Sequence, residues 1–393
     1  MQTTVRYGRE EIPVTLPDGA AVIAACNAEP LPEAVLKEKL LALVPAGRRL
    51  GILLPDRTRP LPVARMLDRL LPELEGREVT LFIGTGIHRT MTEAETAAHV
   101  GARGARCRIV PNAPDDPAAY ARVGVTSRGT PVELLKAAME QDALLGLTLV
   151  RPHYYAGFSG GRKVFVPGIA SRRCIQANHS LVLDPDPARG KYPRAVLGVL
   201  EGNPVALDMA EAASLVPVPC RLAHGLMQDG RLIDLLPDFD AAVERVRTLF
   251  EVRPPEGRFD ALVVSAGGHP YDTDFIQGHK ALENAVGGLR PGGTLYAYIA
   301  APEGFGSPDG LEFLRLGSVE AAARRLREAF KVYGHTALSI MLKGLKYDIR
   351  LHTQLPAEPV RLMGFSPWDG VLPPGLPAAT AFMPQGGSVY FQQ

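Results

Sequence analysis

Residues 50–60, Leu-Gly-Ile-Leu-Leu-Pro-Asp-Arg-Thr-Arg-Pro, decide the fold because they join an apolar run to a charged turn. The run Leu50–Leu54 is short and wholly apolar, which is typical of a buried strand. A helical spacing of apolar residues then follows over Leu61–Leu74. A strand, a polar turn and a helix in succession form the unit from which layered α/β sheets are built.

The same alternation continues downstream and predicts a largely parallel sheet. Further strands are expected at 79–83, 107–110 and 144–150. A helix is expected at 92–100, where Thr92 and Glu95 have the spacing of a capping box.

A second series begins after the stretch 252–257, Val-Arg-Pro-Pro-Glu-Gly, which is the best candidate for a linker. It predicts strands at 261–265 and 294–300, and helices at 273–286 and 318–330, the last capped by Ser318. The sequence therefore predicts an α/β fold of two Rossmann-like layered domains, at residues 1–253 and 258–393. The Pro- and Gly-rich stretch from Trp368 onward fits no element.

Bulk composition excludes several classes of protein. The 393 residues include 43 basic and 42 acidic side chains, so the net charge of +1 gives no electrostatic footprint for nucleic acid. No apolar run reaches the roughly 18 residues of a membrane span, and the charged N-terminus lacks the apolar core of a signal peptide. The four cysteines show no CxxC spacing, which argues against a disulfide framework or a zinc ribbon. We expect a cytoplasmic enzyme that binds neither nucleic acid nor membrane.

Residues suited to chemistry collect where the predicted strands of the first domain end. Asp56–Pro60 follows the first strand, Gly84–Arg89 the second, and Arg151–His153 the fourth, with the loop Gly157–Lys163 close behind. Ligands of open α/β sheets bind beyond the carboxyl ends of strands. Arg, His, Lys and glycine backbone at these ends together predict a site for an anionic ligand.

The residues alone leave two kinds of protein open, a binding module for a phosphate-bearing ligand and an enzyme that needs no cofactor. The glycine loop could cradle a phosphate with its backbone N–H groups, and Lys163 could bind that phosphate. Lys163 is followed by Val164, so the loop lacks the Gly-Lys-Ser/Thr ending of a phosphate loop. A nucleotide- or phosphosugar-binding module therefore remains an alternative, as does a cofactor-free lyase or isomerase of a hydroxy acid.

The combination of motifs resembles the nickel-dependent lactate racemase family. The motifs are Asp-Arg-Thr-Arg at 56–59, Gly-Thr-Gly-Ile-His-Arg at 84–89, His-Tyr-Tyr-Ala-Gly-Phe-Ser-Gly-Gly-Arg-Lys at 153–163, Asn-His at 178–179 and Gln-Gly-His-Lys at 277–280. Their order agrees with that of the family, and the similarity covers most of the chain, weakening after about residue 310.

The resemblance implies a cofactor and its contacts. It implies a nickel pincer nucleotide, Ni(II)-pyridinium-3,5-bisthiocarboxylate mononucleotide, attached covalently to Lys163. His179 would supply one protein ligand to a nickel ion that the planar pincer otherwise holds, and imidazole suits nickel in such a site. Asp56, Arg57, Thr58 and Arg59 would line the cofactor. The enzymes that make this cofactor would be partners of the protein.

The resemblance also implies a reaction, namely racemisation or epimerisation of a small 2-hydroxy acid, lactate-like or larger. Hydride would pass transiently to the cofactor, with His88 and His153 as the two acid/bases. Arg59 in the first domain, and Gln277 and Lys280 in the second, would bind the substrate, which places the active site in the interdomain cleft. Trp368 does not align with the tryptophan that the family has near its substrate, so the resemblance does not specify lactate among 2-hydroxy acids.

Overall fold

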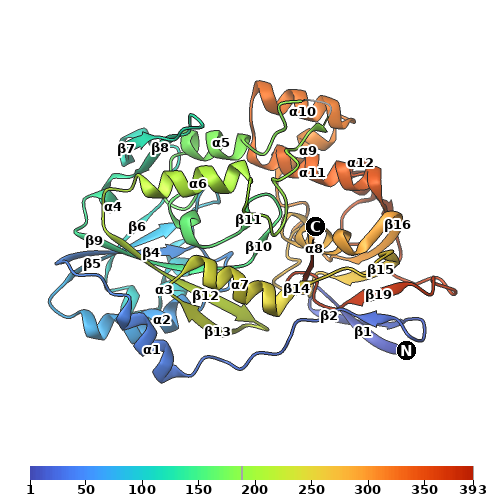
Figure 1. Cartoon of the computed structure of the whole chain (residues 1–393), viewed down its shortest axis with the longest axis horizontal. Helices are drawn as coiled ribbons and strands as arrows, with labels where there is room; N and C mark the ends of the chain where they lie inside the picture. Colours follow the sequence, from blue (N-terminus) through green and yellow to red (C-terminus); the bar gives the residue numbers. More distant parts are fainter. Residues whose placement is uncertain (187–188, 393) are drawn as a thin grey trace. The chain divides into compact units, whose positions relative to one another are not determined.

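The computed structural model of the chain describes residues 1–186 and 189–392. These residues form two compact units (Figure 1). The central unit comprises Asn27–Leu181 and Val199–Arg247, and the terminal unit comprises Met1–Cys26, Val182–Gly198 and Thr248–Gln393. The mixed α/β architecture predicted from the sequence is confirmed.

This division differs from the predicted domains 1–253 and 258–393 because two early segments join the terminal unit. Near the N-terminus, strand β3 (Ala21–Val22) pairs with β19 (Thr380–Met383). In the segment 182–198, Lys191 donates to Ser339 Oγ at 3.1 Å. Both connections link residues that are far apart in sequence, so local patterns give no sign of them.

The central unit is built on a sheet with the strand order β13-β12-β9-β4-β5-β6. Strands β12, β9, β4, β5 and β6 run parallel, and β13 pairs antiparallel with β12. The strands are β4 (Arg49–Pro55), β5 (Glu78–Gly84), β6 (Arg108–Pro111), β9 (Ala143–Leu149), β12 (Cys220–Gln228) and β13 (Arg231–Leu236). The predicted strands at 50–54, 79–83, 107–110 and 144–150 therefore exist, with each end shifted by one residue.

Helices cover both faces of this sheet. In Figure 1, α5 and α6 lie above it, and α1 and α2 lie below it. Leu50, Ile52 and Leu54 alternate along β4 and pack into one buried core with the helices α1 to α3. The helices are α1 (Glu33–Ala42), α2 (Val63–Leu70), α3 (Glu93–Gly104), α4 (Lys136–Met139), α5 (Arg172–Ser180), α6 (Pro204–Ser214) and α7 (Phe239–Phe250).

Two helix ends show how local sequence sets the boundaries. Helix α3 begins with the capping box formed by Thr92 and Glu95, as the sequence predicts. The helix expected over 61–74 is α only to Leu70, and Leu71–Leu74 is a 3₁₀ turn, η1, that contains Pro72. Proline has no N–H for the α-helical hydrogen bond, which explains the change of helix type.

Smaller elements connect the layers of the central unit. They are the 3₁₀ turns η2 (Pro117–Ala119) and η3 (Gly161–Val164), the hairpin of β7 (Tyr120–Val125) and β8 (Pro131–Leu135), and the short pair β10 (Pro152–His153) and β11 (Gly157–Phe158).

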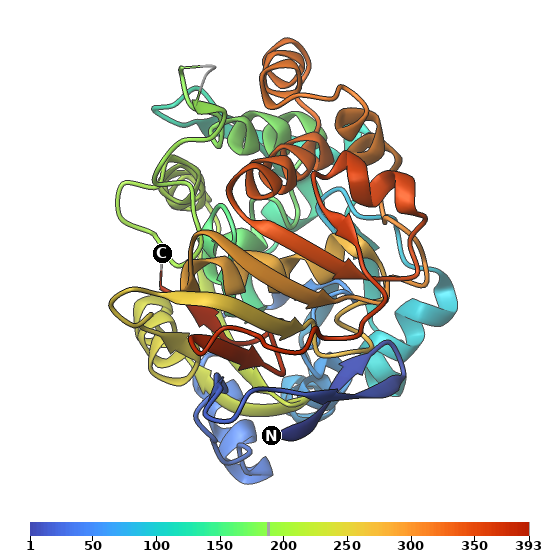
Figure 2. The same ribbon diagram turned by 90° about the vertical axis from the view of Figure 1, so that its right-hand side faces the viewer.

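The terminal unit has a parallel sheet in the order β18-β17-β16-β15-β19-β3. Figure 2 shows its strands side by side. The C-terminal stretch that fits no predicted element supplies β19, which pairs with β15. The remaining elements are β1 (Gln2–Tyr7), β2 (Glu10–Thr15), β14 (Glu251–Val252), β15 (Phe259–Ser265), α8 (Phe275–Ala285), η5 (Val286–Gly288), β16 (Leu289–Tyr298), α9 (Pro308–Leu314), α10 (Val319–Glu328), α11 (Val332–Lys346), β17 (Asp348–His352), α12 (Ala357–Leu362), β18 (Ser366–Pro367) and β20 (Tyr390–Phe391).

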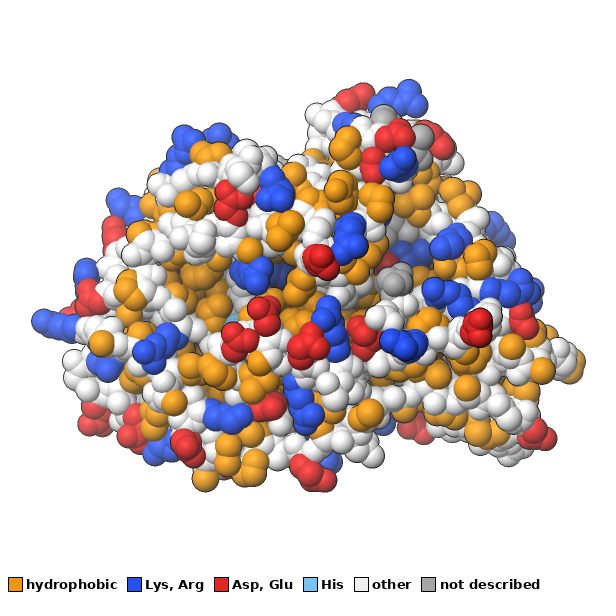
Figure 3. All heavy atoms as spheres, in the orientation of Figure 1, with side chains coloured by type: hydrophobic (Ala, Val, Ile, Leu, Met, Phe, Trp, Pro, Cys, Tyr) orange, Lys and Arg blue, Asp and Glu red, His pale blue; other side chains and the backbone are white. Residues whose placement is uncertain are grey.

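Charges of both signs are mixed on the drawn surface (Figure 3), and the described helices are short or polar. On the face drawn in Figure 3, basic and acidic side chains are interspersed rather than gathered into a basic stripe. Among the described residues, every helix is too short or too polar to cross a bilayer.

The register of the central sheet aligns three strand ends. Pro55 of β4 lies opposite Gly84 of β5, and Leu53 of β4 lies opposite Gly146 of β9. Because these strands are parallel, the turns that follow them leave the sheet at one edge, where ligands of open α/β sheets bind.

Gly157, the first residue of the loop 157–163, allows a test of how tightly that loop is packed. Gly157 has φ +71°, and a Cβ at that position would lie 2.3 Å from the Val199 carbonyl oxygen. Gly129 has a similar φ of +84° in open space, so it isolates the backbone strain. We expect Gly129→Ala to lower the free energy of unfolding by about 1–2 kcal/mol. Gly157→Ala should cost at least about 1 kcal/mol more because of the steric clash. Chemical denaturation measures both, and equal losses would contradict the packing described.

Candidate active site

The turn after β4 and the turn after β5 meet in an aspartate–histidine pair. His88 Nδ1 lies 2.6 Å from Asp56 Oδ2. The Asp56 side chain is 5% exposed and that of His88 is 29% exposed, so the ring is half-buried while the carboxylate is buried. The sequence predicted both residues in the site, and the structure brings them into direct contact.

Asp56 is held as a carboxylate by its neighbours. Burial works to raise its pKa, but the His88 ring, the Arg59 charge and a hydrogen bond from Thr58 together keep the pKa well below its usual range. Thr58 donates to Asp56 Oδ1 from its hydroxyl at 2.6 Å and from its backbone N–H at 3.0 Å. An ionised carboxylate can only accept, so His88 carries a proton on Nδ1. When the ring is neutral, its lone pair is therefore on Nε2, which has no partner among the described residues.

Arg57 does not join this group. Its Nε lies 3.2 Å from Glu95 Oε1 at the start of α3, and its side chain is 48% exposed. Glu95 also pairs with Arg89. The structure therefore directs Arg57 to the helix terminus, whereas Thr58 and Arg59 turn toward Asp56.

The charges of Arg59 and Lys163 lie near enough to influence each other. Burial of the ammonium, and then the charge of Arg59, lower the pKa of Lys163 from 10.5 to about 7. Within residues 1–186 and 189–392, no carboxylate forms an ion pair with Arg59 or Lys163. A fork of guanidinium donors beside an amine is suited to a carboxylate or phosphate ligand.

The glycine loop before Lys163 is explained by packing rather than by open backbone. The N–H groups of Ser159 and Lys163 donate to the carbonyls of Arg151 and Gly160, and that of Gly161 donates to the Thr148 hydroxyl. A Cβ on Gly161 would lie 2.5 Å from Phe239. These three donors are already used, so they are not available to cradle a phosphate.

Tyr155 stands at the centre of the site, although the sequence motif at 153–163 gave no reason to assign it a role. Its ring is 4.5 Å from the ring of His153 and 5.3 Å from that of His179, measured between centroids. The Lys163 ammonium lies 5.4 Å from the same ring. Asn203 anchors the Tyr155 carbonyl with a 2.9 Å hydrogen bond. Three predicted site residues are thus gathered on one buried aromatic ring.

His153 has the tautomer opposite to that of His88. The backbone N–H of Ala156 donates to His153 Nδ1 at 3.4 Å. A neutral ring that accepts at Nδ1 carries its proton on Nε2. His153 follows β9 and His88 follows β5, and β4 lies between these strands in the sheet. When both rings are neutral, His153 therefore has its proton on Nε2, whereas His88 has its lone pair there.

His179 is buried on α5, 3% exposed, next to Asn178. Its Nδ1 lies 3.1 Å from Asn178 Oδ1. No cluster of three or more metal-ligating side chains occurs in the described part of the chain.

Gln277 and Lys280 belong to the terminal unit, where they share a face of α8. Lys280 Nζ donates to Gln277 Oε1 at 2.5 Å, and both residues lie on the helix predicted at 273–286. Trp368 of the same unit packs edge-on against Tyr296 and Tyr298, with centroids 5.1 Å away in each case. The roles predicted for Gln277 and Lys280 toward substrate stay predictions.

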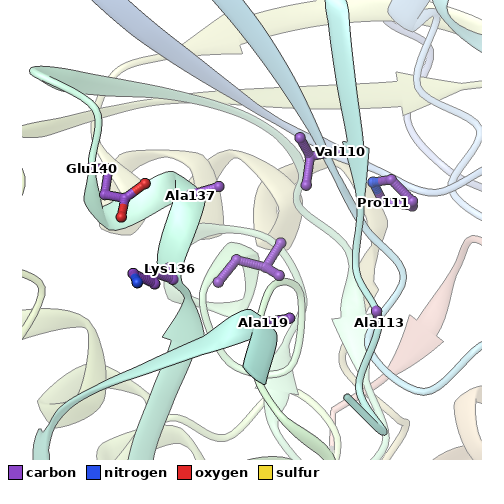
Figure 4. A pocket seen from close by; sticks show the side chains of 8 residues that line it. Val110, Pro111, Ala113, Ala119, Lys136, Ala137 and Glu140 are labelled. Atoms are coloured by element: carbon purple, nitrogen blue, oxygen red, sulfur yellow. The ribbon is translucent and has the colours of Figure 1, made fainter. Parts of the chain in front are cut away.

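A cavity of about 390 Å³ in the central unit contains none of the predicted site residues. Figure 4 shows its lining, which is mostly apolar. The lining residues are Val110, Pro111, Ala113, Ala119, Leu135, Lys136, Ala137 and Glu140. It offers one amine and one carboxylate, so the strand-end cluster is the better candidate for chemistry.

Comparison with known proteins points to one family. Residues 3–190 match the family model described as the lactate racemase N-terminal domain. A lactate racemase from Thermoanaerobacterium thermosaccharolyticum is 28% identical over 277 residues, and one from Lactiplantibacillus plantarum is 29% identical over 282 residues. Each alignment covers 68% of this chain, and it spans 64% of the length of the relative.

Solved structures share the fold. The lactate racemase apoprotein from Thermoanaerobacterium thermosaccharolyticum superposes with a TM-score of 0.87 at 22% identity, over the full length of both chains. A protein from Thermotoga maritima gives a TM-score of 0.71 at 18% identity, covering 93% of this chain and all of the other. At these identities the likeness establishes the fold alone.

The lowered pKa of Lys163 predicts unusual reactivity at neutral pH. Only the neutral amine attacks an acylating reagent, and the neutral fraction rises as the pH rises through the pKa. With a pKa of about 7, labelling of Lys163 by acetic anhydride should reach half its maximal rate near pH 7. Peptide mass mapping measures this rate, with Lys163→Arg identifying the peptide. Labelling that begins only near pH 10 would contradict the buried, Arg59-influenced environment.

Proposed function

Because the chain belongs to the lactate racemase family, we propose that it is an isomerase that interconverts the configurations of a small 2-hydroxy acid, lactate-like or larger. The observation that most directly supports this proposal is the grouping of His153, His179 and Lys163 around Tyr155. An acid/base, a possible metal ligand and a nucleophilic amine are thereby within reach of one bound ligand.

The residues fit a lysine-tethered nickel pincer nucleotide. Covalent attachment needs an amine that loses its proton near neutral pH, and Lys163 has a pKa of about 7. A pincer that supplies three donors needs one further ligand, and a neutral imidazole such as His179 suits nickel. Arg59 and Thr58 belong to the turn that would border the group. When bound, the group supplies a pyridinium carbon able to accept hydride from the C2 atom of the substrate.

The two remaining histidines would move the proton of the substrate hydroxyl. His88 offers Nε2 as an acceptor because Asp56 fixes the proton on Nδ1. Asp56 also stabilises the ring once it becomes charged, since the carboxylate is in direct contact with Nδ1. His153 would return a proton to the oxygen of the keto acid, which requires its ring to be imidazolium at that point. Their roles reverse when the opposite enantiomer enters, as racemisation requires.

The substrate carboxylate would be bound by cationic and amide donors. Arg59 presents a planar guanidinium that no carboxylate of the described residues occupies. Gln277 and Lys280 present an amide and an ammonium from one face of α8. The enzymes that build the pincer nucleotide would be the protein's partners, because this chain must receive the group ready-made.

Covalent attachment gives the first test. We expect protein co-produced with the cofactor-making enzymes to carry nickel and a mass adduct on Lys163. Lys163→Arg keeps the charge but should remove the adduct and the activity, because guanidinium is a poor nucleophile at neutral pH. Lys136→Arg is the matched control on the surface. Intact mass and metal analysis measure both, and an adduct that persists on another lysine in Lys163→Arg would refute the assignment.

The two histidines give a second test. We expect His88→Ala and His153→Ala each to lower turnover about 10²- to 10⁴-fold, the usual range for a positioned acid/base. Each variant should still reduce the cofactor with the enantiomer whose base remains. Stopped-flow absorbance with D and L substrate separately should therefore show opposite preferences in the two variants. Identical preferences would contradict the two-base arrangement.

A further inference from the structure

We propose that Asn178 and Asp208 are positioning residues that fix the tautomer of His179, so that its Nε2 atom is the nitrogen presented to nickel. The part of this inference that concerns nickel rests on the proposed function, whereas the part that concerns the His179 tautomer does not. Asn178 and His179 are neighbours on α5, and Asp208 lies on α6. A turn of the β7–β8 hairpin completes the arrangement through Thr126.

The orientation of the Asn178 amide is determined by its partners. Its Nδ2 atom lies 2.8 Å from Asp208 Oδ2 and 3.2 Å from the Val205 carbonyl oxygen. Both partners accept hydrogen bonds, so the atom facing them must be the NH₂ group. The amide oxygen is therefore the atom that faces His179 Nδ1, at 3.1 Å.

Asp208 is itself held by a second donor. The Thr126 hydroxyl lies 2.5 Å from Asp208 Oδ1. The backbone N–H of Thr130 donates to that hydroxyl at 3.1 Å, so the hydroxyl proton is directed to the carboxylate. Both oxygens of Asp208 are thus engaged as acceptors. A rotated Asn178 amide would place its own oxygen against one of them, which is unfavourable.

The consequence for His179 follows from the amide oxygen. An amide oxygen accepts and cannot donate, so His179 must carry a proton on Nδ1 to make this hydrogen bond. The neutral ring then has its lone pair on Nε2. A partner that fixes one ring nitrogen in this way commonly sets which nitrogen of a histidine binds metal.

Burial makes the arrangement specific. Asn178 and Asp208 are fully buried, and Thr126 is 4% exposed. Water therefore has little access to replace any of these partners, and a buried donor or acceptor without one is costly. The Tyr155 ring packs edge-on to the His179 ring and limits its rotation.

The apoprotein tests the tautomer without any metal. In protein labelled with ¹⁵N-histidine, each of the nine histidines gives ring signals whose ¹⁵N shifts separate protonated from unprotonated nitrogen. His179→Gln identifies the signals of His179. We expect Nδ1 of His179 to be protonated and Nε2 not. A proton found on Nε2 would overturn the inference, whatever the protein's activity.

Matched variants then test the role of the two residues. Asn178→Leu should lose the tautomer preference and hold nickel about 10- to 100-fold more weakly, the usual effect of removing such a partner. Asp208→Asn should retain both, because its amide oxygen can still accept from Asn178. Gln176→Leu on the same helix is the control for an amide-to-aliphatic change. Circular dichroism checks that each variant is folded.

The outcomes separate this inference from the proposed function. If His179→Gln loses nickel while Asn178→Leu holds it as tightly as the wild type, the positioning role is wrong. If His179→Gln itself retains nickel, the proposed metal ligand fails, and the metal part of this inference fails with it. The ¹⁵N measurement on the apoprotein still decides the tautomer in that case.

Discussion

The parallel alignment of β9, β4 and β5 is the constraint on which the rest of the central unit depends. Side-by-side parallel strands end at one edge, so the three turns after them bring polar groups together that are about 100 residues apart in sequence. The apolar faces of the same strands bury against helices, which fixes the register and leaves the turns to vary in chemistry. The Asp56–His88 contact is a direct result, because it joins the ends of two adjacent strands.

At this edge of the sheet, burial and neighbouring charges together determine the protonation of Asp56 and Lys163. Asp56 is buried, yet three neighbours keep it ionised. Lys163 is also desolvated, but its nearest charge is another cation, so it tends to lose its proton instead. The charge of Arg59 disfavours the charged form of Lys163, and an anionic group bound between them would offset that repulsion. The histidines differ in the partner of Nδ1, and this difference gives them complementary protonation at Nε2.

Local patterns predicted what is local in this structure. The apolar run at 50–54, the capping box of Thr92 and Glu95, and the cap at Ser318 all appear as expected. The strand-end residues His88 and Asp56 were predicted because parallel sheets place such turns together. Local sequence patterns could not predict three other features, because each depends on contacts between distant segments. These are the central position of Tyr155, the Asn178–Asp208 pair and the strand β3. Arg57 belongs to the motif at 56–59, yet its side chain pairs with Glu95, and the spacing of the motif does not reveal this contact.

The central claim is that the hydrogen on C2 of the substrate moves as hydride within the site and does not exchange as a proton. The direct test is to racemise a 2-hydroxy acid deuterated at C2, in ordinary water, with protein carrying its cofactor. Mass spectrometry of the product enantiomer then counts the deuterium at C2. The account predicts that the product retains its deuterium. Replacement of that deuterium by hydrogen from water, at the rate of racemisation, would contradict it and would favour proton abstraction by a cofactor-free isomerase.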